Sequence, residues 1–114
     1  MGELDEGCTA KDVILYILAD HARKELTLNR SMEFGGPGLR SLSMDERATL
    51  CNMATECSAR TGICEADEST MEWIRSQRPE MDIESQQQGV SMPDPGAEYT
   101  GGVHTIDLLS LIHI

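Results

Sequence analysis

Hydrophobic positions near the amino terminus recur at the spacing of an amphipathic helix, with about 3.6 residues per turn. The recurring residues are Val13, Ile14, Ile17 and Leu18. Thr9 stands before this run, and Asp12 follows three residues later. This spacing lets a hydroxyl and a carboxylate cap the first turn of a helix. The pattern predicts a helix over residues 10–22, and His21 near its end is interpreted as a cation or hydrogen-bond donor at the negative end of the helix.

A second helix is predicted over residues 43–60, because Ser43 and Glu46 form the S-x-x-E capping box and the stretch lacks Gly and Pro. Its residues are mostly small or unbranched on several faces, which is typical of a helix packed on more than one side. Asn52 and Glu56 are four residues apart and are predicted to share a face. Burying a carboxylate or an amide without a hydrogen-bond partner lowers the stability of a protein by about 1–3 kcal/mol. Asn52 and Glu56 are therefore the candidate active-site residues.

Alternating polar and apolar residues predict short strands on either side of this helix. Residues 29–34 alternate and stop at the Gly-Gly-Pro-Gly turn of residues 35–38, and residues 61–64 are long enough for one more strand. A Gly-rich turn can cradle phosphate, but no P-loop or dinucleotide fingerprint follows here. The turn is therefore interpreted as structural, and the order of elements indicates an α/β protein.

The second half of the chain is less regular. A third helix is predicted over residues 70–78, capped by Asp67 or Ser69 and ended by a proline, with Met71 and Trp73 facing the core. Residues 80–102 are rich in Gln, Pro and Gly and predict a long irregular connection. Residues 103–107 alternate again, which predicts a strand with His104 pointing to solvent.

Composition narrows the possible partners. The net charge is −11, so the field of the chain repels a phosphate backbone and nucleic acid is not an expected partner. The amino terminus lacks the positive region of a secretory signal, and the early apolar run of residues 13–19 is far shorter than the roughly 20 residues that span a bilayer. A cytoplasmic protein without a membrane partner is expected. Only 4% of the residues are aromatic, which is little packing material for an independent domain.

The cysteines do not follow a metal-binding pattern. They are Cys8, Cys51, Cys57 and Cys64. None forms C-x-x-C, and no histidine stands near them at zinc-finger spacing. They are interpreted as small buried thiols, with a small cysteine-based metal site as the alternative.

The run Cys51-Asn-Met-Ala-Thr-Glu56 resembles a central segment of the aconitase superfamily, as does Met32-Glu-Phe-Gly-Gly-Pro-Gly38 before it. Further matching pieces flank these two runs in the expected order. They are Thr9-Ala-Lys-Asp-Val-Ile-Leu15, Pro93-Asp-Pro-Gly-Ala-Glu-Tyr99 and His104-Thr-Ile-Asp-Leu108. The resemblance covers about residues 3–108 and is strongest to the large subunit of 3-isopropylmalate dehydratase and its homoaconitase-like relatives.

This resemblance implies a partial α/β/α domain of the aconitase type and a hydro-lyase that dehydrates and rehydrates a hydroxy acid such as 3-isopropylmalate. It also implies a [4Fe-4S] cluster with one open iron that acts as a Lewis acid. The family places a glutamate and an asparagine beside the cluster. They correspond here to Glu56, which would hold or exchange a proton, and Asn52, which would donate to a cluster sulfide or thiolate.

Other parts expected of the family have no match in this sequence. The cluster-binding cysteines lie in later motifs, the histidine-bearing and Asp-Ser-His segments are missing, and the serine base belongs to a swivelling domain or small subunit. The Gly-rich stretch before the first strand is replaced by Lys24-Glu-Leu-Thr-Leu-Asn29. We therefore expect residues 1–108 to be a central fragment of the catalytic domain that is inactive alone, and residues 109–114 to be a non-native tail.

Two alternatives stay open at this point. One is a non-catalytic acidic α/β interaction module that keeps the fold of the segment. The other is a fragment of a hydro-lyase for citrate, homocitrate or 2-methylmalate, because these enzymes share the carboxylate and the amide.

Overall fold

The computed structural model describes residues 2–108 and has the mixed α/β character that the sequence predicts. The α-helices are α1 (Ala10–Asp20), α2 (Met44–Asn52), α3 (Glu68–Gln77) and α4 (Ile83–Gln88). The strands are β1 (Ser31–Phe34) and β2 (Thr61–Cys64). Three short 3-10 helices complete the order: η1 (Ala22–Lys24), η2 (Pro37–Ser41) and η3 (Thr55–Cys57).

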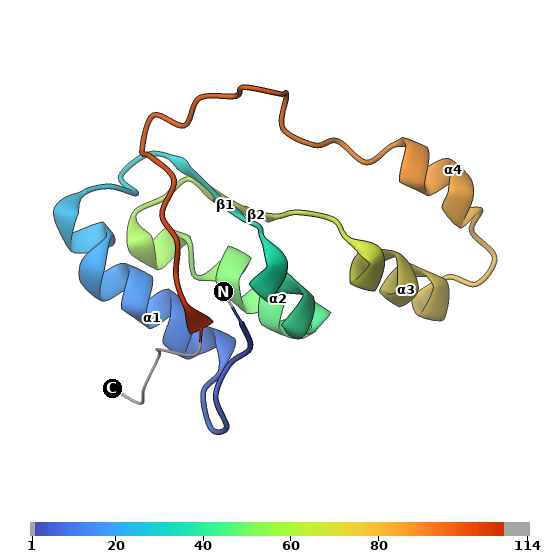
Figure 1. Cartoon of the computed structure of the whole chain (residues 1–114), viewed down its shortest axis with the longest axis horizontal. Coiled ribbons are helices and arrows are strands. Elements are labelled where there is room, and N and C mark those ends of the chain that lie inside the picture. The colour runs from blue at the N-terminus through green and yellow to red at the C-terminus, as the bar shows by residue number, and fades with distance from the viewer. Residues whose placement is uncertain (1, 109–114) are drawn as a thin grey trace.

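β1 and β2 form a parallel pair whose register runs from Ser31 opposite Thr61 to Phe34 opposite Cys64. Parallel neighbours need a crossover connection, and here α2 lies within it. Side chains alternate between half-buried and exposed along both strands. The helices α1 and α2 lie on the same side of the strands in Figure 1. This arrangement is one layer of helices on a short parallel sheet, which is a partial α/β domain.

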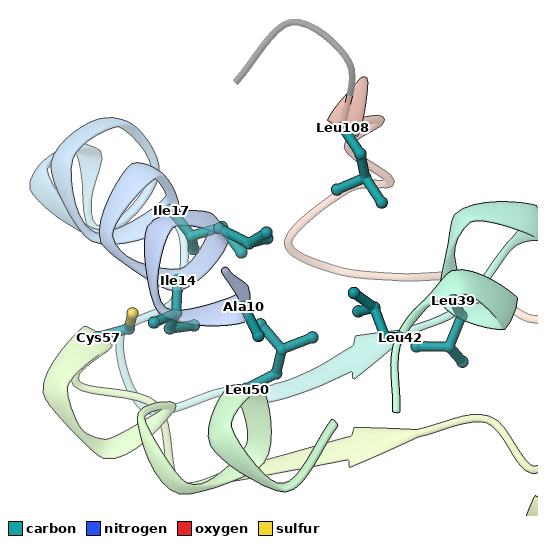
Figure 2. Close-up of a cluster of buried hydrophobic side chains, with 9 residues drawn as sticks. Ala10, Ile14, Ile17, Leu39, Leu42, Leu50, Cys57 and Leu108 are labelled. Carbon is teal, nitrogen blue, oxygen red and sulfur yellow. The ribbon is translucent and has the colours of Figure 1, made fainter. Parts of the chain in front are cut away.

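A single cluster of buried apolar side chains joins α1 to the rest of the molecule (Figure 2). Ile14 is 1% exposed and lies near the thiol of Cys57, which is also 1% exposed. Leu50 comes from α2, and Leu108 closes the cluster from the far end of the described chain. A fully buried side chain of this size contributes about 1.5–3 kcal/mol, so the cluster is the main source of stability.

The predicted helix starts are confirmed. The Asp12 carboxylate accepts a hydrogen bond from the Thr9 backbone N–H at 2.7 Å. At the start of α2, Ser43 accepts from the Glu46 N–H, and the Glu46 carboxylate accepts from the Ser43 N–H. Asp67 caps α3 by accepting from the Thr70 N–H. Capping patterns identified all three starts because they depend only on neighbours in the sequence.

The predicted helix over residues 43–60 is wrong in its second half. α2 ends at Asn52, and the Ala54 N–H bonds to the Cys51 carbonyl, three residues back instead of four. The chain then turns through η3 and through Ser58, which has a positive φ of 61°. The turn returns the chain to β2 beside β1.

Three smaller expectations also need correction. Residues 80–102 are not wholly irregular, because they contain α4, whose first turn is capped by Asp82 through the Ser85 N–H and hydroxyl. Residues 103–107 form no strand. Met71 is buried as expected, but Trp73 is 46% exposed, because α3 and α4 lie at the end of the molecule opposite α1 (Figure 1).

Two further expectations concern the C-terminal residues and membrane-spanning helices. Residues 109–114, predicted to be a non-native tail, lie outside the described residues. Within residues 2–108, no helix is both long enough and apolar enough to cross a bilayer.

Candidate functional site

Arg47 fixes the first half of α2 in place. Its side chain is 3% exposed and donates to the carbonyl oxygens of Leu42 at 3.1 Å and Leu39 at 2.8 Å. The same guanidinium donates to both carboxylate oxygens of Asp67, at 2.8 and 2.9 Å. These hydrogen bonds hold the pKa of the Asp67 carboxyl below its usual range. Arg47 therefore joins α2, η2 and the cap of α3 in one charged, hydrogen-bonded unit.

The last turn of α2 lies directly against β2. A Cβ atom at Gly62 would be 2.9 Å from the Cα of Cys51 and 3.1 Å from the Cβ of Ala54. Real Cβ atoms do not approach backbone atoms that closely, so the contact depends on glycine. It fixes the backbone of Cys51 and therefore the position of the next residue, Asn52.

Asn52 and Glu56 are not a pair on one helix. Asn52 is the last residue of α2, whereas Glu56 lies in η3, and the Glu56 N–H bonds to the Met53 carbonyl and not to that of Asn52. Both residues are exposed. The structure therefore corrects the reason for choosing them, which was burial on a crowded helix, and presents both to solvent in the turn after α2.

Glu56 lines an open depression between η3 and the second half of α1. The other lining residues are Leu15, Leu18, Ala19, Ala22, Arg23 and Ser58. Asn52 does not line this depression. Among the described residues, the two candidate groups thus lie near the same turn but are not brought together in one pocket.

The cysteines differ in their surroundings. Cys57 is part of the core, as the sequence predicts for buried thiols, but the other three are only partly buried. The sulfur atoms of Cys51 and Cys64 lie 3.6 Å apart, a proximity that their spacing in the sequence does not reveal. Burial and the hydrogen bond with Cys51 raise the pKa of the Cys64 thiol to about 12.

A groove of about 820 Å³ runs between β1, the Gly-rich turn and residues 98–106. Along it, the Tyr99 hydroxyl donates to Glu33 at 3.0 Å. The exposed His104 ring meets the His21 ring edge-on, with 4.8 Å between centroids. Burial is the main reason that the pKa of His21 is lowered, and His104 is the second. Burial therefore favours the neutral form of the His21 ring, which packs under the last part of the described chain, over the cation that was one of the two roles expected from the sequence.

Comparison with known protein families gives a match to the Aconitase family (aconitate hydratase) over residues 1–113. The chain belongs to the aconitase family. Members of this family are hydro-lyases that generally bind a [4Fe-4S] cluster, so the broad assignment made from the sequence is confirmed.

The described residues of this aconitase-family chain do not fit an iron–sulfur cluster by themselves. Such clusters are held by Cys thiolates from several positions. Cys57 is enclosed in the core, and Cys51 and Cys64 contact each other. Within residues 2–108, no three His, Cys, Asp or Glu side chains lie close enough together to hold a metal ion.

Proposed function

We propose that this chain supplies part of the active site of an iron–sulfur hydro-lyase, which moves a hydroxyl group of a hydroxy acid by removing and restoring water. The family match over residues 1–113 carries the proposal, because it includes the whole run from Cys51 to Glu56. The exposure of both candidate side chains supports it, since groups that act on a substrate must be reachable.

Glu56 is proposed to hold or exchange the proton of the substrate hydroxyl. A carboxylate in an open depression beside Arg23 has room for a small acid and for the water that is removed. Asn52 is proposed as a hydrogen-bond donor toward the cofactor, because an amide beside a cluster tunes its charge without adding charge of its own. Its place next to the rigid contact between Cys51 and Gly62 supports a positioning role.

The remaining parts of the site are proposed to come from outside residues 2–108. These parts are the thiolate ligands of the cluster and a base on a swivelling domain or small subunit. We propose 3-isopropylmalate as the hydroxy acid. The sequences of the segments Glu33–Gly38 and Ser43–Arg47 support this choice, because they resemble the large subunit of 3-isopropylmalate dehydratase. Citrate, homocitrate and 2-methylmalate are the other substrates to be compared in the same assay.

A substitution at Glu56 tests this function in the assembled hydro-lyase. E56Q keeps the size of the side chain but removes the proton-exchanging group, so we expect kcat to fall by about 10²–10⁴. The visible absorption of the cluster should stay unchanged. The matched control is E72Q, which replaces an exposed glutamate on α3 and should leave kcat unaltered. Full kcat in E56Q would contradict the role of Glu56, and no activity on any of the four acids would favour a non-catalytic interaction module.

A further inference from the structure

We propose that Cys51 and Cys64 form a reversible disulfide that links the last turn of α2 to the end of β2. Their sulfur atoms are 3.6 Å apart, and a disulfide needs about 2.05 Å, so closing the bond requires only a small shift of two side chains. Gly62 already holds the two backbones together, because β2 approaches to within van der Waals contact of Cys51.

The surroundings of the pair select it over the other thiols. Cys51 and Cys64 are both half-buried, so a small oxidant can reach them. Cys57 is 1% exposed and lies in the core beside Ile14 (Figure 2). Cys8 lies before α1, outside the contact between α2 and β2. Among the cysteines of the described chain, the pair whose sulfur atoms lie within hydrogen-bond distance is therefore the one that would be oxidised.

Glutathione disulfide is a sufficient oxidant. The Cys51 thiolate attacks one of its sulfur atoms, forms a mixed disulfide and releases one glutathione thiolate. Cys64 then loses its proton to solvent and attacks the Cys51 sulfur, which releases the second glutathione. Two protein thiols are oxidised to one disulfide, and one glutathione disulfide is reduced to two glutathione molecules. Burial raises the pKa of the Cys64 thiol, which disfavours Cys64 as the first nucleophile.

The disulfide would close the segment between residues 51 and 64, which contains both Asn52 and Glu56. Oxidation would thereby tether the turn that carries the candidate active-site groups. This consequence rests on the proposed function, whereas formation of the bond does not.

Peptide mapping of the 114-residue chain tests the proposal without any measurement of activity. The folded chain is incubated with excess glutathione disulfide, its remaining thiols are blocked, and it is digested with trypsin. We expect a peptide containing Cys64 to be joined to the peptide of residues 48–60 and to be released by dithiothreitol. Tandem mass spectrometry is needed to assign the bond, because Cys51 and Cys57 share that tryptic peptide.

Matched variants complete the experiment. C51S and C64S should each abolish the crosslink, whereas C8S should retain it. A bond from Cys57 or Cys8, a stable glutathione adduct without a crosslink, or thiols that stay free in the folded wild type would each overturn the proposal. Wild-type mapping alone is decisive if a cysteine variant fails to fold. Because this outcome does not depend on catalysis, it can fail while the hydro-lyase assignment stands.

Discussion

Arg47 is a buried charge that is tolerated because its N–H donors are satisfied by Asp67 and by the carbonyl oxygens of Leu39 and Leu42. A pair of this kind adds little over apolar packing, but removing one partner leaves the other charged and buried. Its main effect is geometric: it holds α2, η2 and α3 in one arrangement, and the candidate site begins where α2 ends.

Replacing the acidic partner should show how strongly this unit depends on pairing. D67A leaves the Arg47 guanidinium buried with its carboxylate missing, so we expect the free energy of unfolding to fall by about 3–5 kcal/mol in urea titrations. R75A removes the exposed pair of Arg75 with Glu68 in the same helix and should cost less than about 1 kcal/mol. Equal losses in the two variants would contradict the structural role of Arg47.

Arg47 and the Cys51–Cys64 contact could not be predicted from the sequence. Arg47 meets Asp67 across 20 residues, and the two thiols meet across 13, so each contact depends on how α2, β2 and α3 pack. The run from Cys51 to Glu56 was identified through its resemblance to the aconitase superfamily. The conformation of this run was not predicted, because it contains no Gly or Pro that would indicate the end of a helix.

Among the elements, α1 is held against the end of the described chain by the contact between the His21 and His104 rings. The groups that face His21 are Asp20, at 3.6 Å from its Nδ1, together with Lys24, Tyr16 and His104. Burial outweighs the attraction of Asp20, so the pKa of His21 is lowered. The folded chain therefore favours the neutral ring.

This balance predicts a loss of stability in mild acid. Because the folded pKa lies below the ordinary value of 6.5, the unfolded chain takes up the proton first. The contribution of neutral His21 to the free energy of unfolding is fully present above pH 6.5. It is lost as the pH falls from there through the folded pKa. Urea unfolding of H21Q should show a smaller change between pH 7.5 and pH 5.5 than that of the wild type. An identical pH dependence in the two proteins would contradict this account.

Elements were predictable to the extent that their signals are local. The starts of α1, α2 and α3 follow from capping residues, and β1 and β2 follow from alternation and turn residues. The end of α2 was missed because tertiary packing sets it: after Asn52 the chain turns through η3 and Ser58 so that β2 can pair with β1. Met71 and Trp73 were both expected in the core, but α3 buries Met71 and leaves Trp73 46% exposed.

At the scale of the whole molecule, one core cluster carries the described chain, and large apolar side chains are exposed elsewhere, including Ile63, Trp73 and Val103. Ile63 lies on the face of the sheet opposite to α2. A parallel sheet is usually covered on both faces, and here helices cover one of them. The stability of the described chain therefore depends on the apolar contacts of this one cluster.

A cavity in that cluster should be costly. I14A removes most of a side chain that is 1% exposed, and we expect a loss of about 2–5 kcal/mol in the free energy of unfolding. A domain is typically stable by only about 5–15 kcal/mol, so this loss is a large fraction of the total and should lower the urea midpoint of I14A markedly. The neighbouring variant L15A, with a side chain that is 38% exposed, is the control and should stay folded by circular dichroism. Comparable stability of the two variants would show that the cluster is not the main source of stability.

The parallel pairing of β1 with β2 also affects when the sheet can form during synthesis of the chain. Ser31 pairs with Thr61, so β1 emerges from the ribosome before its partner strand does. Adding the 30 residues from Met32 to Thr61 takes about 1.5 to 6 seconds at about 5–20 residues per second. During that interval β1 has no strand beside it, so its backbone groups are unpaired and Met32 and Phe34 are not yet packed against the core.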